Sequence, residues 1–367
     1  MADVFRFADD LGPLEIVHIH RPSVGLKAVV AIDNIACGPA VGGVRMAADV
    51  SAEEAFRLAR AMTLKNAAAG LPHGGGKSVI FADPKMALAD KERLIRAFAS
   101  AIADLTDYIP GPDMGTDELA MAWIKDETGR AVGLPREIGG IPLDEVGATG
   151  FGLAVAIDVA ARHIALDLKG ARFVVQGFGS VGRHAARHLA AKGAVLVAAS
   201  DSQGAVLDET GLDIPALEAL KAEGKSVKDY PRGRAVAADA IIDLPCEIWI
   251  PAARPDVITA GNAGRLKTRL VAQGANIPCT PEAEAALAGR GVLILPDFIA
   301  NAGGVICAAT EYQRGTQAQA FATIADKIGE NTEAVLAEAK RTKSSPRAAA
   351  LSLATAKVRR AMQMRRW

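Results

Sequence analysis

The alternation of apolar and polar positions divides the first part of the chain into short strands and amphipathic helices. Apolar runs at 14–20, 27–33 and 78–81 predict strands. A helix is expected over 51–69, between the second and third of these strands, and two more follow at 90–106 and 116–129. Residues 132–146 are rich in Gly and Pro and show no periodicity, so we expect a junction between domains there.

After the junction, strands and helices alternate regularly. A helix over 149–163 leads to a strand at 172–176, a helix at 181–192 and a strand at 195–200. Further short apolar strands are expected at 247–250, 270–272 and 292–295, and long helical patterns at 316–340 and 346–364. Such alternation is typical of a parallel sheet covered on both faces, and we therefore predict an α/β fold.

Composition narrows the function classes. Half of the 367 residues are hydrophobic, and 42 basic residues balance 42 acidic ones, so no net charge attracts nucleic acid or an anionic membrane. No apolar run approaches the roughly 20 residues that span a bilayer. Four widely spaced cysteines predict reduced thiols in a cytoplasmic protein, and the histidines lack metal-ligand spacing, so no metal site is expected.

A dinucleotide-binding motif follows the strand at 172–176. The strand leads directly into the run Gly177-Phe178-Gly179-Ser180-Val181-Gly182, which opens a helix. In this context the glycines allow a tight turn and close approach of a pyrophosphate to the helix N-terminus. Asp201 ends the next strand, where an acid binds the adenosine ribose and favours NAD. Ser202 beside it is able to hydrogen-bond a phosphate, so NADP is possible as well.

The helix at 51–69 carries the first candidate for substrate binding. Ser51 is a good N-cap and Glu54 would complete a capping box. Leu58, Met62 and Lys65 fall at i, i+4 and i+7, which places the Lys65 ammonium on an apolar stripe. Because burying an ammonium without an anionic partner is costly, we expect it to meet a small anion.

A second lysine and an aspartate complete the candidate chemistry. Lys77 follows three glycines, and a second cation together with partial burial would lower its pKa, so that it can act as a base. Asp113 lies in a turn-rich segment before a helix and is the candidate for moving protons to and from an amino group. Each residue alone has an ordinary structural explanation, a solvated lysine after a tight turn or a turn aspartate.

Taken together, six segments resemble the family of glutamate, leucine, phenylalanine and valine dehydrogenases. They occur in the family's order at residues 38–46, 65–77, 112–116, 148–150, 272–276 and 301–305, with the glycine motif between the fourth and fifth. The resemblance implies a substrate-binding and oligomerisation domain over 1–142 and a Rossmann NAD-binding domain over 143–330. The helices at 331–367 would pack back on the first domain, and the active site would lie in the cleft between the domains.

The resemblance also implies roles for individual residues. Lys65 would bind the substrate carboxylate, Lys77 would activate water and Asp113 would carry protons to and from the substrate nitrogen. The pocket of Lys65 would be lined by Gly42 and Gly43. The residues around the nicotinamide and substrate would be Thr149, Asn276 and Asn301. The implied reaction is reversible NAD-dependent oxidative deamination of an L-amino acid to a 2-oxo acid and ammonia.

Two positions bear on the side chain of the substrate. Glutamate dehydrogenases carry a lysine where this chain has Val41, and a serine where it has Ala308, and both bind the side-chain carboxylate. A pocket of Val41, Met62, Val305 and Ala308 predicts an apolar substrate such as leucine, valine, phenylalanine or tryptophan. The chain length is also near that of leucine and phenylalanine dehydrogenases.

Two alternatives stay open. The first alternative to the dehydrogenase of an apolar amino acid is an NAD(P)-dependent glutamate dehydrogenase with a relocated anchor, for which Arg45 is the nearby cation. The second is an inactive nucleotide-binding regulatory protein. The resemblance further implies a homo-oligomer, with no nucleic-acid or membrane partner. The strands at 14–33 are candidates for pairing between subunits.

Overall fold

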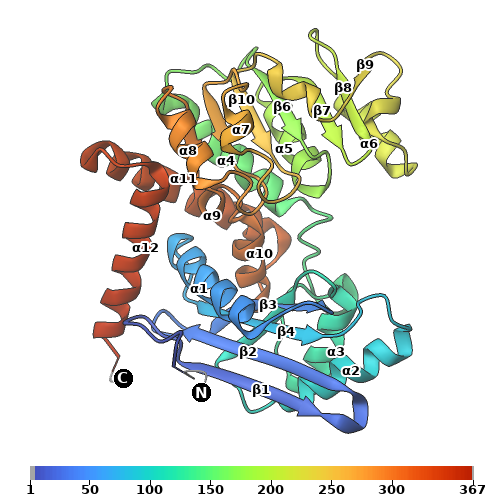
Figure 1. Cartoon of the computed structure of the whole chain (residues 1–367), viewed down its shortest axis with the longest axis vertical. Coiled ribbons are helices and arrows are strands. Elements are labelled where there is room, and N and C mark those ends of the chain that lie inside the picture. The colour runs from blue at the N-terminus through green and yellow to red at the C-terminus, as the bar shows by residue number, and fades with distance from the viewer. Residues whose placement is uncertain (1–4, 366–367) are drawn as a thin grey trace. The chain divides into compact units, whose positions relative to one another are not determined.

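A computed structural model describes residues 5–365, and its elements are labelled in Figure 1. The chain forms two compact units. The first contains the residues up to Pro142, Val305–Ala320 and the chain from Leu351 onward, and the second contains Leu143–Gly304 and Phe321–Ala350. Relative to the ranges expected from the sequence, residues 305–320 therefore group with the first unit and residues 331–350 with the second.

The first unit is built on a mixed five-stranded sheet of order β1-β2-β4-β3-β5. Its strands are β1 (Glu15–Arg21), β2 (Leu26–Asn34), β3 (Ala40–Ala47), β4 (Gly74–Phe81) and β5 (Tyr108–Pro112). The pairs β1–β2 and β2–β4 are antiparallel, whereas β3 runs parallel to both β4 and β5. The sequence predicted β1 and β2 but not β3 or β5, which are rich in Gly and Pro.

Helices cover both faces of this sheet (Figure 1). Alternate residues of β2 explain the arrangement, because Val29 and Ala31 pack with Ala55 and Ala59 of α1 (Ala52–Ala68), whereas Val30 joins the core on the opposite face. That second core includes large side chains of α2 (Leu88–Ala101) and α3 (Glu118–Thr128). Strand alternation of this kind is what a sheet with two buried faces requires.

The three glycines before Lys77 form the start of β4 rather than a turn. A Cβ on Gly75 would lie 2.0 Å from the backbone nitrogen of Thr63 in α1, and one on Gly76 would lie 2.8 Å from the Tyr108 ring. Larger residues would therefore push α1 and β5 away from β4. The strand predicted at 78–81 therefore begins at Gly74, four residues earlier than expected, because the glycines pack closely within the sheet.

The N-terminus of α1 confirms one half of its predicted cap. The Ser51 side chain accepts a hydrogen bond of 3.1 Å from the Glu54 N–H, but the Glu54 carboxylate pairs with Arg45 instead of closing a capping box. The buried face of α1 also differs from the predicted stripe. Ala55, Ala59 and Thr63 are buried, whereas Leu58, Met62 and Lys65 are half-buried beside them.

The second unit is built on a seven-stranded sheet of order β12-β11-β10-β6-β7-β8-β9. Its strands are β6 (Arg172–Gln176), β7 (Val195–Asp201), β8 (Gly204–Leu207), β9 (Arg234–Val236), β10 (Ile248–Pro251), β11 (Leu270–Ala272) and β12 (Leu293–Leu295). The first five in this order are parallel, as predicted, but β8 and β9 add an antiparallel edge. The sheet is thus mixed and retains the Rossmann-like parallel core.

Helices surround this sheet and continue to the end of the chain. They are α4 (Ala148–His163), α5 (Ser180–Ala191), α6 (Ile214–Ala222), α7 (Ala260–Ala263), α8 (Pro281–Ala288), α9 (Asp297–Ala300), α10 (Gly303–Tyr312), α11 (Gln317–Thr342) and α12 (Pro346–Gln363). Short 3-10 turns lie at Pro22–Val24, Arg136–Ile138, Val227–Asp229 and Ala240–Asp243. Within residues 5–365, no helix combines the length and apolar character needed to cross a membrane.

Candidate active site

Lys77 and Asp113 meet in the first unit, as a buried ion pair. Lys77 lies on β4 and Asp113 follows β5 directly, and β3 lies between these two strands in the sheet. The ammonium of Lys77 donates to Oδ2 of Asp113. The Lys77 side chain is 8% exposed and that of Asp113 20%, so the pair is largely shielded from water.

Gly43 of β3 makes this approach possible. A Cβ at this position would lie 2.7 Å from the Asp113 Cβ and 3.0 Å from the Lys77 Nζ. Glycine is required at position 42 for another reason, because a Cβ there would lie 1.5 Å from the Gly76 carbonyl oxygen. The two glycines therefore permit tight strand packing beneath the ion pair.

Arg45 is a third charged member of the cluster. Its Nε lies 3.3 Å from Oδ2 of Asp113, and its Nη1 donates to Oε1 of Glu54 at 2.5 Å. Oδ2 of Asp113 thus accepts from two cations at once. The sequence analysis named Arg45 only as a possible anchor for a substrate carboxylate, and its engagement by two carboxylates argues against that role.

Burial and charge move the pKa values of the pair. Burial lowers the pKa of the Lys77 ammonium, and the neighbouring Asp113 carboxylate offsets this only in part. Burial works to raise the pKa of Asp113, but the charges and hydrogen bonds of Lys77 and Arg45 outweigh it, so the net shift is downward. Asp113 therefore stays ionised, while Lys77 loses its proton more easily than an exposed lysine.

The two positions that bear on substrate choice lie together in an apolar cluster. Val41 of β3 and Ala308 of α10 pack with Ile109 and Val132, and all four are buried. Glu311, one turn after Ala308, holds the adjoining loop, because its carboxylate accepts the N–H groups of Leu134 at 3.2 Å and Ile141 at 2.7 Å.

The other predicted substrate residues lie on α1 and α10. Lys65 lies in the last turn of α1 and is half-buried. Met62 and Val305 are half-buried as well.

The second unit contains the glycine motif in the predicted setting. Gly177 follows β6 directly with φ of +103°, and a Cβ on it would lie 2.7 Å from the backbone of Ala253. A Cβ on Gly182 would lie 2.1 Å from the Gly177 carbonyl oxygen, whereas the space around Gly179 is open for 4 Å. Gly179 therefore leaves room for a pyrophosphate at the N-terminus of α5, and Ser180 and Val181 begin that helix. These residues fit a dinucleotide.

Two predicted nicotinamide residues contact each other. The amide nitrogen of Asn301 donates to Oδ1 of Asn276 at 2.9 Å. Thr149 lies near the glycines that open α10, since a Cβ on Gly304 would lie 3.0 Å from its Oγ1. The three residues thus occupy segments of the same unit.

Asp201 is bound within its own unit. Its Oδ2 accepts from the Lys221 ammonium at 2.8 Å and from the Val227 N–H at 3.0 Å. Its Oδ1 accepts from the Ser226 hydroxyl at 2.8 Å and from the Gln203 N–H at 2.9 Å. Ser202 next to it is exposed.

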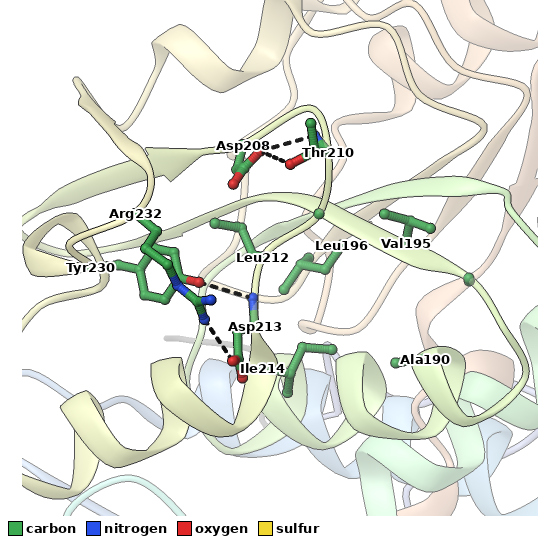
Figure 2. Close-up of a pocket in the computed structure, with 12 residues that line it drawn as sticks. Ala190, Val195, Leu196, Asp208, Thr210, Leu212, Asp213, Ile214, Tyr230 and Arg232 are labelled. Atoms are coloured by element: carbon green, nitrogen blue, oxygen red, sulfur yellow. Dashed lines mark hydrogen bonds and ion pairs between the residues drawn. The ribbon is translucent and has the colours of Figure 1, made fainter.

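The cavity drawn in Figure 2 is a different feature of the second unit. It has a volume of about 460 Å³ and is lined by Val195 and Leu196, at the start of β7, and by Tyr230 and Arg232. The cavity lies at the N-terminal end of β7, whereas the glycine motif follows the C-terminal end of β6. Because β6 and β7 are parallel, the two features lie at opposite ends of these strands. Arg232 pairs with Asp213 at 2.7 Å beside the cavity (Figure 2), and none of the predicted site residues lines it.

Among residues 5–365, no group of three or more His, Cys, Asp or Glu side chains is placed to hold a metal ion.

The residues that sequence reasoning missed are Glu54 and Lys221. Their roles become visible only in the folded chain, where Glu54 pairs with Arg45 and Lys221 pairs with Asp201.

Comparisons with known proteins identify the family to which the chain belongs. Residues 139–366 match the family model described as Glutamate/Leucine/Phenylalanine/Valine dehydrogenase, and residues 15–130 match the dimerisation domain of the same family. The glutamate dehydrogenase of Aeropyrum pernix is 39% identical over 357 residues, covering 91% of this chain and 85% of the relative. The NADP-specific glutamate dehydrogenase of Saccharolobus shibatae is 38% identical, covering 76% of this chain and 69% of its own.

Solved structures extend the likeness to the fold. The hetero-hexameric glutamate dehydrogenase of Thermus thermophilus, in its Leu-bound form, superposes with a TM-score of 0.85 at 31% identity and covers 96% of this chain and 90% of its own. The L-tryptophan dehydrogenase of Nostoc punctiforme does so with a TM-score of 0.76 at 26% identity, covering 96% and 98%.

The narrower expectation of closeness to leucine and phenylalanine dehydrogenases finds no support in the curated relatives, which are named glutamate dehydrogenases. The family resemblance itself is confirmed over both halves of the chain. The chain therefore belongs to the glutamate, leucine, phenylalanine and valine dehydrogenase family, whose members are oxidoreductases that act on the amino-bearing carbon of amino acids.

Proposed function

We propose that this protein catalyses the reversible oxidative deamination of an L-amino acid, in which amino acid, NAD(P) and water give the 2-oxo acid, ammonia and NAD(P)H. The observation that carries the proposal is the buried pair of Lys77 and Asp113 with Arg45 beside it. A lysine with a lowered pKa next to an ionised carboxylate supplies a base and a proton carrier at one place.

The proposed roles follow from charge and protonation. The glycine motif at Gly177, Gly179 and Gly182 would hold NAD(P), which would supply the acceptor for the hydride from the substrate Cα. Lys65 binds the substrate carboxylate, and neutral Lys77 takes a proton from the water that attacks the iminium carbon. The ionised Asp113 carboxylate takes a proton from the substrate amino group as the iminium forms and later returns it to the departing amine, which leaves as ammonia. Asn276, Asn301 and Thr149 orient the reacting groups.

A variant at Lys77 tests the chemistry. Lys77→Met keeps the length of the side chain and removes the base, so we expect turnover to fall by about 10³-fold while NADH or NADPH still binds. Turnover equal to that of the unaltered protein would remove Lys77 from the mechanism. Loss of both turnover and cofactor binding, with a normal melting temperature, would favour a different site.

Glutamate is the substrate that the curated relatives favour, since those at 38–40% identity are named glutamate dehydrogenases. This is the alternative kept open in the sequence analysis, and the comparisons support it better than the apolar substrate. Its side-chain carboxylate would then need an anchor other than positions 41, 308 or 45. An unpaired buried carboxylate would cost on the order of several kcal/mol.

An apolar amino acid is the second candidate, and the cluster of Val41, Ile109, Val132 and Ala308 is the observation that favours it. A panel of glutamate, leucine, valine, phenylalanine and tryptophan, followed by NAD(P)H absorbance with each cofactor, separates the two. Turnover of glutamate alone would rule out the apolar pocket. Turnover of an apolar amino acid with little on glutamate would establish it.

The double variant Val41→Lys with Ala308→Ser gives an independent measure. If the pocket is apolar, the new cation and hydroxyl are expected to raise the ratio of kcat/KM for glutamate to that for leucine by about 100-fold. A ratio that stays constant would show that these positions do not face the substrate side chain. Val29→Thr, in the core under α1, is a control that leaves the pocket untouched.

The protein is further proposed to act as a homo-oligomer. The matched dimerisation domain supports this, as does β1, which lies at the edge of its sheet with one side unpaired by any strand of the described chain.

A further inference from the structure

Asp201 lies where a Rossmann fold places the acid that binds the adenosine ribose, at the end of the strand after the glycine motif. To accept from the ribose hydroxyls, such a carboxylate needs free lone pairs directed at the sugar. Here the side chain is 9% exposed. All four of its acceptor directions are used by donors of its own unit.

The charge of Asp201 is also neutralised. Lys221, in the last turn of α6, places its ammonium 2.8 Å from Oδ2 and remains 25% exposed. Burial works to raise the pKa of Asp201, but the bonds from Lys221, Gln203, Val227 and Ser226 lower it to about 2, so the acid is ionised at neutral pH. The carboxylate therefore neither offers hydrogen-bond acceptors to a ribose nor presents an uncompensated negative charge.

We infer that Lys221 makes this corner accept a 2′-phosphorylated dinucleotide, so that the chain binds NADP about as well as NAD. The inference rests on the cofactor class of the proposed function and assigns the residue that sets cofactor choice. The ammonium cancels the repulsion that Asp201 would exert on a 2′-phosphate, and the exposed Ser202 adds a hydroxyl donor. This inference reverses the expectation from the sequence that Asp201 selects NAD.

Cofactor binding without an amino-acid substrate tests this directly. Calorimetric titration of the full chain with NAD and NADP is expected to give Kd values within about threefold of each other. The fragments 5′-ADP and 2′,5′-ADP, which differ by the 2′-phosphate, should show the same near-equality. NADP binding at least about 30-fold weaker than NAD binding would overturn the inference.

Two variants separate the roles of the ion pair. Lys221→Met is expected to weaken NADP about tenfold relative to NAD, because Asp201 then stands unneutralised. Asp201→Asn is expected to leave the NAD affinity within about twofold, since the acid does not serve the ribose. A tenfold loss of NAD affinity in Asp201→Asn, with the melting temperature showing a folded protein, would show that Asp201 does bind the ribose.

A matched control lies four residues further on. Lys225 is exposed and pairs with Glu223 at 2.8 Å, so Lys225→Met removes one positive charge from the same region without touching Asp201. Its ratio of NADP to NAD affinity should equal that of the unaltered protein, and a loss equal to that of Lys221→Met would reduce the effect to general charge and overturn the inference. If neither dinucleotide bound, both the proposed function and this inference would fail, whereas NAD binding with NADP excluded would overturn the inference alone.

Discussion

Gly43 sets how closely the two catalytic candidates approach. Its missing side chain leaves the space in which Lys77 and Asp113 meet, since a Cβ there would come within 3.0 Å of both residues. The contact between Lys77 and Asp113 therefore depends on the lack of a Cβ atom at position 43. The sequence showed the Gly-Gly pair but not its reason, because the neighbours of Gly43 come from two other strands.

Gly43→Ala is therefore expected to displace Lys77 or Asp113 and to lower kcat by about 100-fold or more while the protein stays folded. Steady-state kinetics and a thermal melt measure the two effects. Gly329→Ala is the control, because nothing lies within 4 Å of its Cβ position in α11. It should keep full activity and raise stability by up to about 1 kcal/mol. Full activity in Gly43→Ala would contradict the proposed geometry.

Arg45 tunes both members of the pair. Its charge lowers the pKa of Asp113, after burial and Lys77, and it also lowers that of Lys77. Replacing it with methionine therefore raises both pKa values, and the rate profile of Arg45→Met should move to higher pH. The measurement is kcat/KM for the best substrate across the pH range in which the protein stays folded. A profile that does not move would show that Arg45 acts only in packing.

At the element scale, the elements with strong local signals were predictable and those held by tertiary contacts were not. Strand β6 and the glycine motif after it begin and end where the sequence placed them, because a β-branched run leads into a glycine turn. Strands β3 and β5 were missed, since Gly and Pro have low strand propensity and only pairing with β4 and with each other orders them. The charged site was thus recognisable from motifs, whereas its geometry was not.

The ion pair of Asp201 with Lys221 links β7 to α6, and the N–H of Val227 extends the link to the turn at Val227–Asp229. Because the folded-state pKa of Asp201 is about 2, below its ordinary value of 3.8, its contribution to stability is present above pH 4 and is lost as the pH falls toward 2. After allowance for solvent screening, this contribution is about 1–2 kcal/mol.

Asp201→Asn should therefore lower the free energy of unfolding at pH 7 by about that amount. Near pH 2.5 the free energies of unfolding of the variant and the unaltered protein should lie closer together. Chemical denaturation at the two pH values measures this. Asp243→Asn, which alters an exposed pair with Arg265, is the comparison and should change stability by less than about 1 kcal/mol. A difference between Asp201→Asn and the unaltered protein that did not depend on pH would contradict the assignment.

At the scale of the whole molecule, the chain divides the proposed chemistry between two units. The first holds the ion pair and the apolar cluster, and the second holds the glycine motif and the Asn276–Asn301 contact. The family and the fold class were recognisable from the order of the motifs. The family resemblance implied that the segment 305–320 belongs to the second unit, whereas its contacts, including that of Ala308 with Val41, group it with the first.

The proposed assembly has a simple test at this scale. Light scattering on the purified protein should give a molar mass that is a multiple of the 38.0 kDa chain. A monomer with full turnover would show that neither fold nor activity needs a second copy.

The carboxylate of Glu311 has a consequence for protein engineering. It accepts the backbone N–H groups of Leu134 and Ile141, so these two hydrogen bonds do not depend on which side chains the loop carries, although both residues are also buried. We therefore expect substitutions at Val132 and Ala308 to leave these two hydrogen bonds in place, because neither side chain takes part in them. If the proposed apolar pocket is correct, a combinatorial library at these two positions is expected to yield enzymes with altered amino-acid preference.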